Sequence, residues 1–239
     1  MKRIIFPGWA VPVNLYLDYS PDDILDFGFF TCEERDCATN ATEVDPSELN
    51  DLFLQQAVGD EPVIVIAHSL GSLLALRSSQ IFDNVKAAII IGGFAKFTKS
   101  EPDYPDGKPE SGISMMQNMM KLSPKMVLDK FYHAMSEPSG YAVLPKGKVD
   151  VARLKAGLQY LTKTDLRENL KDVNIPVLIL HGDSDQIVSV KLAEFLAENI
   201  PNAKLQVIEN AGHSVPFTHK KECIQLIDDF IAENNFSIN

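Results

Sequence analysis

The chain has 239 residues, of which 45% are hydrophobic and 23% are charged, and its formal net charge at pH 7 is −11. A chain of this length and composition can bury a sizeable core, which excludes a fibrous or intrinsically disordered protein. The negative charge argues against nucleic acid as a partner, because a phosphate backbone would repel it.

Membrane spans, secretion signals and metal sites are not expected from the sequence. Every apolar run is shorter than the roughly 18 to 20 residues that a spanning helix needs, and the N-terminal segment turns at Pro7 after one short strand, unlike a signal peptide. Cys32, Cys37 and Cys223 form no metal-binding pair, and their odd number favours a reduced setting. We therefore expect a cytoplasmic protein with no metal and no organic cofactor.

Short apolar runs rich in branched residues alternate along the chain with longer helical stretches. This alternation is typical of a mostly parallel sheet with helices on both faces, so we predict an α/β fold with about six strands. The predicted strands span 3–6, 26–30, 63–67, 87–91, 177–181 and 204–209. The predicted helices around this sheet span 46–57, 70–80, 190–199 and 221–233, each with apolar residues three and four apart.

The strand pattern disappears in the middle of the chain. Helical stretches take its place at 114–120 and 124–135, with turns at 101–109 and 137–148. We interpret the segment 96–165 as a helical lid, inserted into a core made of residues 1–95 and 166–239.

Methionines gather in one helical stretch of this lid, at Met115, Met116, Met119 and Met120. Two interpretations are open: ordinary helix packing, or a deformable apolar wall for a flexible substrate. On the second interpretation, Met116 and Met120 contact the substrate together with Trp9 and Phe97.

A buried strand runs directly into a serine, and a helix rich in leucine and alanine follows at once. This is typical of a nucleophile elbow, a sharp turn that presents a serine at the end of a strand. The turn needs small residues two before and two after Ser69, and these are Ala67 and Gly71. The alternative is that Ser69 only caps the helix. His68 is expected to be structural, because so sharp a turn points it away from the nucleophile.

An acid and a histidine follow the last two predicted strands. Asp183 and Asp185 both come after the fifth strand, and the three-residue offset of Asp185 from Gly182 favours it as the orienting acid, with Asp183 as the alternative. His213 follows the sixth strand and is the predicted base. The order serine, acid, histidine is that of α/β-hydrolases.

Two backbone amides are predicted to form an oxyanion hole. The amide of Leu70 lies at a helix N-terminus, where it can stabilise negative charge. The second donor is expected in the loop after the first strand, where Gly8 allows a close approach and Trp9 offers its amide. The side chain of Trp9 is equally well interpreted as a core aromatic.

Four segments carry a resemblance to a known family: Phe6-Pro7-Gly8-Trp9, Lys96-Phe97-Thr98, the stretch from Leu154 to Arg167, and the stretch from Gly212 to Phe217. They resemble the pimeloyl-acyl-carrier-protein methyl ester carboxylesterases of biotin synthesis, the BioH type, which have the α/β-hydrolase fold. The resemblance implies that Ser69, His213 and Asp185 hydrolyse the methyl ester of a pimeloyl group held on acyl carrier protein, with release of methanol.

The segment 96–165 holds eleven basic and eight acidic residues in an otherwise acidic chain. Since acyl carrier proteins are acidic, the resemblance gives these cations a role, and Lys121, Lys125, Arg153 and Lys155 are expected to dock the carrier. A solvated helical surface would give the same count. The alternatives for function are a general short-acyl carboxylesterase, a lyase of menaquinone synthesis with the same triad, or a non-catalytic ligand receptor. We expect a monomer.

Overall fold

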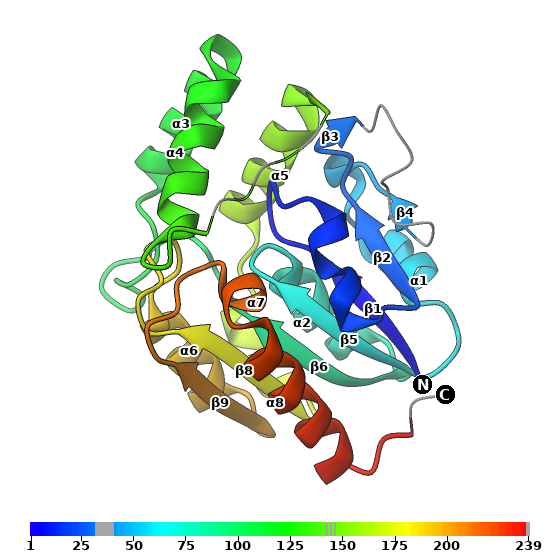
Figure 1. The fold of residues 1–239 in the computed structure, drawn as a ribbon. Coiled ribbons are helices and arrows are strands. Elements are labelled where there is room, and N and C mark those ends of the chain that lie inside the picture. Colours follow the sequence, from blue (N-terminus) through cyan, green and yellow to red (C-terminus); the bar gives the residue numbers. More distant parts are fainter. Residues whose placement is uncertain (32–40, 142, 144, 146, 238–239) are drawn as a thin grey trace.

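A seven-stranded parallel sheet forms the centre of the structure, a computed structural model that describes residues 1–31, 41–141, 143, 145 and 147–237. Within these ranges the sheet order is β4-β2-β1-β5-β6-β8-β9 (Figure 1), and every pair of neighbours is parallel. The strands are β1 (Lys2–Phe6), β2 (Asp23–Asp26), β4 (Ala41–Glu43), β5 (Val63–His68), β6 (Val85–Ile91), β8 (Val177–Gly182) and β9 (Ala203–Ile208). The prediction of a mostly parallel sheet is confirmed, with one strand more than expected.

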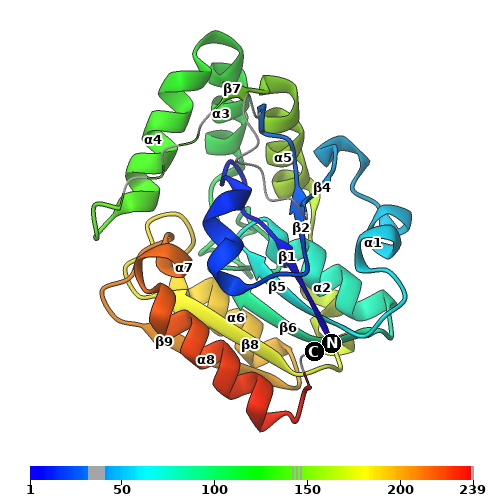
Figure 2. The same cartoon turned by 45° about the vertical axis from the view of Figure 1, so that its right-hand side comes forward.

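Helices cover both faces of this sheet, so its central strands β5, β6 and β8 are buried almost throughout. Figures 1 and 2 show α8 on one face and α2 and α6 on the other, and both α2 and α6 contact the short helix η3. The helices around the sheet are α1 (Asp51–Val58), α2 (Gly71–Ile81), η3 (Arg167–Asp172), α6 (Val190–Asn199) and α8 (Lys220–Glu233). Because both sides are apolar, these strands are the continuous hydrophobic runs that the sequence shows.

The predicted strand at 26–30 is wrong in its placement. Asp26 ends β2, where its carboxylate accepts a hydrogen bond of 2.8 Å from the amide of Gly28, and Gly28 has a φ of +59°. The chain therefore turns, and the next residues form β3 (Phe30–Thr31), which pairs antiparallel with β7 (Lys148–Val149) outside the main sheet. The buried residues Phe27 and Phe29 gave this turn an alternating pattern that resembles a strand.

The predicted helix at 46–57 is two helices. Asp45 caps η2 (Pro46–Glu48), and Asn50 then caps α1 by accepting a 3.0 Å hydrogen bond from the amide of Phe53. Each cap satisfies amides at a helix start, so the chain begins a new helix at the second one. The edge strand β4 was not predicted, because it has three residues, of which none is fully buried.

Three helices stand over the carboxyl edge of the sheet in Figure 2: α3 (Glu110–Leu122), α4 (Pro124–Ser136) and α5 (Val151–Lys163). All three fall inside the segment 96–165. The ends of that segment meet, since Lys96 and Asp165 form a β-bridge and an ion pair of 2.9 Å. Adjacent ends are what an insertion into a continuous core requires, although the division into core and lid stays a prediction.

The loops after β1, β5, β8 and β9 all emerge at the edge that the three helices cover, because parallel strands end on the same side of a sheet. Short helices follow two of these strands, η1 (Val13–Tyr19) after β1 and α7 (Val215–Thr218) after β9. Across the ranges that the structure describes, no helix is both long and apolar enough to cross a membrane.

Candidate active site

Ser69 sits on a sharp turn between β5 and α2, with a φ of +51°. Such a conformation is strained for a residue with a side chain and persists only where the surroundings hold it. A Cβ added to Gly71 would collide with the carbonyl of Phe6, so only glycine fits there. Ser72 braces the turn by donating a 2.6 Å hydrogen bond to the carbonyl of Ser69. The elbow expected from the sequence thus has the geometry that its small residues require.

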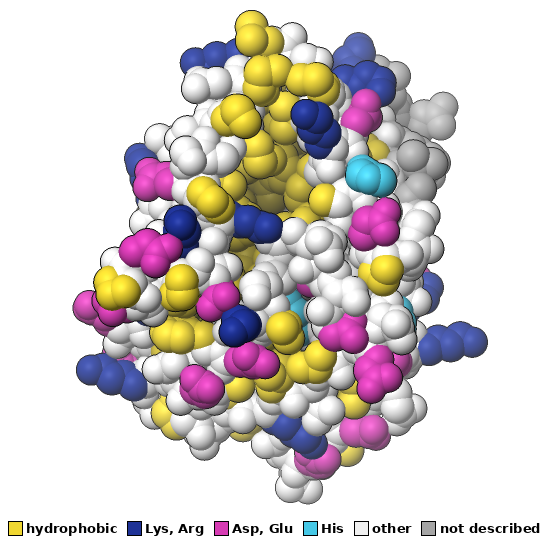
Figure 3. All heavy atoms as spheres, turned by 90° about the vertical axis from the view of Figure 1, so that its left-hand side faces the viewer, with side chains coloured by type: hydrophobic (Ala, Val, Ile, Leu, Met, Phe, Trp, Pro, Cys, Tyr) yellow, Lys and Arg dark blue, Asp and Glu magenta, His cyan; other side chains and the backbone are white. Residues whose placement is uncertain are grey.

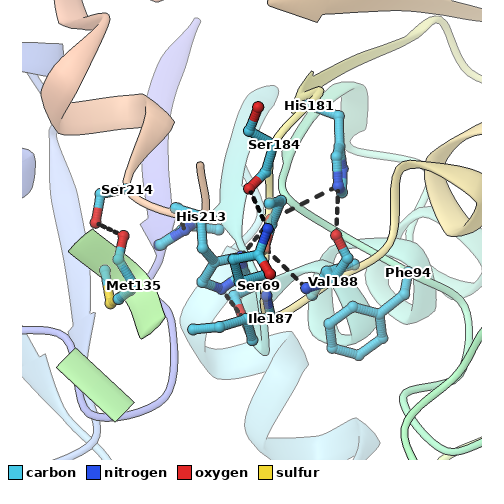
Figure 4. A network of polar contacts seen from close by, with 12 residues as sticks. Ser69, Phe94, Met135, His181, Ser184, Ile187, Val188, His213 and Ser214 are labelled. Atoms are coloured by element: carbon cyan, nitrogen blue, oxygen red, sulfur yellow. Dashed lines mark hydrogen bonds and ion pairs between the residues drawn. The ribbon is translucent and has the colours of Figure 1, made fainter. Parts of the chain in front are cut away.

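His213 lies at hydrogen-bond distance from both Ser69 and Asp185, and Figure 4 shows its ring beside Ser69. Its Nε2 is 2.9 Å from the Oγ of Ser69, and its Nδ1 is 2.7 Å from the Oδ2 of Asp185. A carboxylate only accepts, so Nδ1 carries the proton and Nε2 is free to take one from the serine hydroxyl. These three side chains, 144 residues apart at most, have the arrangement of a nucleophile, a base and an orienting acid.

The carboxylate of Asp185 is buried and held by backbone amides. Its Oδ1 accepts hydrogen bonds of 2.7 Å from Ile187 and 2.8 Å from Val188. Burial raises the pKa of Asp185, but His213, His181 and the hydrogen bond from Val188 together lower it by more, so the net shift is downward and the group stays ionised. Asp183, the alternative acid, is exposed and accepts a hydrogen bond from Ser184 instead.

His181 contacts the loop that carries Asp185. Its Nε2 is 3.0 Å from the carbonyl of Val188 and 3.6 Å from the Oδ2 of Asp185. Since a carbonyl accepts, Nε2 carries the ring proton. Burial lowers the pKa of His181, and the ring is therefore a neutral donor beside the carboxylate.

The loop that carries His213 is fixed against the end of α4. Ser214 donates a 2.7 Å hydrogen bond to the carbonyl of Met135, and both residues are drawn in Figure 4. A Cβ on Gly212 would collide with the carbonyl of Glu137. The base loop and the proposed lid are thus in direct contact.

The two predicted oxyanion donors come from different loops, since Trp9 follows β1 and Leu70 lies between Ser69 and the first residue of α2. Neither the amide of Trp9 nor that of Leu70 donates to another of the described residues. The indole of Trp9 is buried, donates a 2.8 Å hydrogen bond to the carbonyl of Leu154, and packs edge-on against Phe131 at 4.8 Å. Its side chain is therefore a packed aromatic as well as part of the cavity wall.

An apolar cavity of about 390 Å³ opens onto Ser69, and Figure 3 shows it as a hollow lined by hydrophobic side chains. The apolar lining includes Trp9, Phe97, Met115, Met116, Met119, Met126, Phe131 and Leu158. The prediction for Met116 fits this lining, but the prediction for Met120 is wrong, because Met120 is fully buried in the core beneath it. Met126 was not selected from the sequence, because it lies far along α4 from the helix's other methionine, Met135, and lacks the clustering that drew attention to the methionines of α3.

Of the described residues that line the cavity, two are cationic, Lys108 and Lys130, and none is acidic. Lys130 is exposed, and Lys108 donates a 3.0 Å hydrogen bond to the carbonyl of Gln186. Neither lysine was selected from the sequence, where the basic residues of this segment all looked alike. Their place at the cavity is decided by how α4 and the loop before α3 fold over the sheet.

The four predicted docking cations differ in their surroundings. Lys121 and Lys125 are exposed at the junction of α3 and α4, and Lys125 pairs with Asp129 at 2.6 Å. Lys155 is half-buried.

Arg153 corrects the prediction, because its guanidinium is already engaged. It forms ion pairs of 2.8 Å with Glu43 and 3.8 Å with Asp150, and it donates to the carbonyls of Phe27 and Val44. The sequence could not show this, since three of those partners, Glu43, Phe27 and Val44, are more than 100 residues away.

The structure adds two residues to the site. His68 is fully buried beside His213, with ring centroids 5.0 Å apart, and its Nδ1 lies 2.7 Å from the hydroxyl of Tyr16. The expectation that His68 is structural left these contacts unforeseen.

For metal binding, the described residues contain no cluster of three or more His, Cys, Asp or Glu side chains. Cys223 is a buried free thiol, and Cys32 and Cys37 lie outside the described residues.

The fold and this site define an α/β-hydrolase, and the comparison with family models agrees. Residues 6–226 match the alpha/beta hydrolase family, so the chain belongs to that family. The esterase from Exiguobacterium antarcticum has a similar structure, with a TM-score of 0.75 at 17% identity over 96% of this chain and 91% of its own. MenH from S. aureus gives a TM-score of 0.66 at 17% identity over 98% and 94%. The predicted fold class is confirmed.

Curated relatives of the chain include esterases of one named activity. The chain is 26% identical to the pimeloyl-[acyl-carrier protein] methyl ester esterase of Aromatoleum aromaticum over 72% of this chain and 74% of the relative. It is also 26% identical to the enzyme of the same name from Serratia marcescens, over 69% and 68%. The resemblance noted in the sequence is confirmed by these relatives, and so is the expected class of enzyme, a hydrolase of carboxylic esters.

Proposed function

We propose that the protein is a serine carboxylesterase in which Ser69 attacks the carbonyl carbon of an ester. As the bond forms, Nε2 of His213 takes the hydroxyl proton, and Asp185 stabilises the imidazolium that results. The amides of Trp9 and Leu70 donate hydrogen bonds to the negative oxygen of the tetrahedral intermediate. His213 then gives the proton to the leaving oxygen, and an alcohol departs from the acyl-serine.

Water completes the cycle in the same site. His213 takes a proton from the water molecule as its oxygen attacks the acyl-serine, and then returns that proton to Ser69 as the acid leaves. The observation that carries the proposal is the relay itself, with 2.9 Å from Ser69 to His213 and 2.7 Å from His213 to Asp185. The strained φ of Ser69 supports it, since strain of this kind gathers at reactive residues.

The cavity favours an ester whose chain is apolar. Its wall is made of methionine, aromatic and aliphatic side chains, and it opens at Ser69. Burial of an apolar chain there is favourable at about 25 cal/mol for each Å² removed from water. A charged group would have to stay near the mouth, where Lys108 and Lys130 are placed to pair with an anion.

The specific substrate that we propose is the methyl ester of pimeloyl-acyl carrier protein. The named activity of the curated relatives, the apolar cavity and the two cations at its mouth all support an apolar acyl chain on an anionic phosphopantetheine arm. Lys121, Lys125 and Lys155 remain the proposed docking residues for the acidic carrier, together with Lys108 and Lys130 near the arm. Arg153 no longer belongs to this group.

The test is to incubate the purified protein with methyl pimeloyl-acyl carrier protein and to measure the mass of the carrier. We expect the mass to fall by the difference between a methyl ester and a free acid, and the Ser69→Ala variant to leave it unchanged. p-Nitrophenyl esters of increasing chain length are assayed in parallel. Hydrolysis of these esters without any loss of mass from the carrier would support a general esterase and contradict the specific substrate.

A further inference from the structure

A buried chain of hydrogen bonds links three segments of the site. The amide of Gly8, in the loop after β1, donates to the hydroxyl of Tyr16 at 3.1 Å. That hydroxyl lies 2.7 Å from Nδ1 of His68, and Nε2 of His68 lies 3.0 Å from the carbonyl oxygen of His213. These hydrogen bonds therefore connect the loop of Gly8, through Tyr16 and His68, to the backbone of His213.

The geometry fixes every proton in this chain. A carbonyl only accepts, so Nε2 of His68 carries the ring hydrogen and donates it to His213. The amide of Gly8 only donates, so the oxygen of Tyr16 accepts there and its own hydrogen points to Nδ1 of His68. No other assignment satisfies all three contacts with a neutral imidazole.

The surroundings keep His68 uncharged and in place. Burial is the largest cause that lowers the pKa of His68, to about 3, and the nearby His213 lowers it as well. Phe217 packs edge-on against both Tyr16, at 5.2 Å, and His68, at 5.7 Å. A Cβ on Gly8 would approach Nδ1 of His68 to 3.0 Å, so the loop after β1 lies directly on the ring.

We propose that His68 and Tyr16 are positioning residues that hold the backbone of His213 and the loop of Gly8 and Trp9 in a single arrangement. The base and one oxyanion donor would otherwise belong to separate loops, each free to shift. With the hydrogen bonds made, both face the point where the carbonyl of the ester meets Ser69. This inference rests on the proposed function and assigns to His68 and Tyr16 a part in it.

The expected consequence lies in the rate of reaction more than in substrate binding. A preorganised site stabilises the transition state because its dipoles need not move when charge develops. Small displacements of such groups cost on the order of 10- to 100-fold in rate. Loss of a link in the chain is therefore expected to lower kcat and to leave KM nearly unchanged for a small ester.

Two substitutions of His68 separate its two links. In His68→Asn the side-chain oxygen can replace Nδ1 and accept from Tyr16, but the amide does not reach the carbonyl of His213. In His68→Gln the amide nitrogen can replace Nε2 and donate to that carbonyl. We expect His68→Asn to lower kcat for p-nitrophenyl butyrate by on the order of 10- to 100-fold, with KM within about twofold. His68→Gln keeps the hydrogen bond to His213 and loses only the one from Tyr16, so its kcat should be higher than that of His68→Asn and lower than that of the unchanged protein.

Tyr16→Phe tests the other end of the chain, because it leaves the amide of Gly8 without an acceptor. We expect kcat to fall by about tenfold and the affinity for a trifluoromethyl ketone, which forms a tetrahedral adduct with the serine, to fall by a similar factor. Thermal unfolding is measured for each variant. Ile64→Val, a buried change in the same strand as His68, gives the loss of rate that a modest loss of stability alone produces.

The inference is overturned if His68→Asn and His68→Gln have equal kcat values, whether both remain high or both fall. It is also overturned if the loss of kcat in every variant follows the loss of stability along the line set by Ile64→Val. Ser69→Ala, assayed beside them, keeps the two proposals apart. An inactive Ser69→Ala with a fully active His68→Asn contradicts the positioning role alone, whereas an active Ser69→Ala contradicts the proposed function.

Discussion

The sheet edge that carries Ser69, Asp185 and His213 and the helices above it are built in different ways. At the edge, Ser69 and Asp185 follow the buried strands β5 and β8, and His213 follows the edge strand β9. Two backbone amides hold Asp185, and a strained turn holds Ser69. In α3 and α4, amphipathic helices present side chains to the cavity according to how each helix is rotated and packed. From the sequence we could name the individual candidate residues at the sheet edge. For α3 and α4 the sequence indicated only that apolar and basic side chains face the substrate, not which ones.

The largest expected effect tests the sheet edge. Ser69→Ala removes the nucleophile, and kcat/KM for p-nitrophenyl butyrate should fall by on the order of 10⁴- to 10⁶-fold. Ser78→Ala is the matched control, since Ser78 is a buried serine of α2 whose hydroxyl has no hydrogen-bond partner among the described residues. Retention of most of the activity by Ser69→Ala would show that the edge does not contain the reactive centre.

A pair of methionine substitutions tests how α3, in the proposed lid, divides its side chains between packing and the cavity. Met120 is fully buried and lies outside the cavity wall, so Met120→Ala should lower the free energy of unfolding by about 2 to 5 kcal/mol. Met116 lines the cavity, and Met116→Ala should chiefly raise KM for long-chain esters, by about tenfold. Urea unfolding and chain-length series measure the two effects. If both variants changed the same quantity, the division of α3 into two faces would be wrong.

The pH dependence of stability tests whether His68 is neutral at the sheet edge. Burial lowers the pKa of His68 from its ordinary value of 6.5 to about 3, so below pH 6.5 the unfolded chain binds a proton that the folded protein does not. His68 therefore destabilises the folded protein as pH falls, by about 1.4 kcal/mol for each pH unit in that window. In urea unfolding between pH 7 and about pH 4.5, His68→Gln should lose less stability than the unchanged protein. Parallel curves for the two proteins would contradict a neutral His68.

The last prediction concerns the cations of the proposed lid. Lys130→Glu reverses a charge at the cavity mouth and should lower kcat/KM for the carrier-bound ester by about tenfold, while a small neutral ester is unaffected. Lys171→Glu makes the same change at an exposed lysine of η3, which does not line the cavity, and serves as the control. Equal effects of Lys130→Glu on both esters would contradict an interaction between Lys130 and the carrier-bound substrate.

Local rules account for what could be predicted and for what could not. The elbow, the acid three residues after Gly182 and the histidine after the last strand are each encoded within about ten residues, so the sequence identified them. The errors arose where distant segments decide the outcome. Arg153 pairs with Glu43, and Met120 faces the core while its neighbour Met119 faces the cavity. The strand predicted at 26–30 was misplaced for a similar reason. The chain turns at Gly28 and then forms β3, which pairs with β7 in the proposed lid.

The sequence by itself determined the alternation of the central strands with their helices and the three side chains proposed to react, because short-range sterics and the order of segments specify them. Only the tertiary structure decided which lysines and methionines line the cavity. It alone also brought Tyr16 and His68 together in the buried hydrogen bonds that connect two loops. Contacts of this second kind join residues far apart in the chain, and they form only when packing brings those residues into one place.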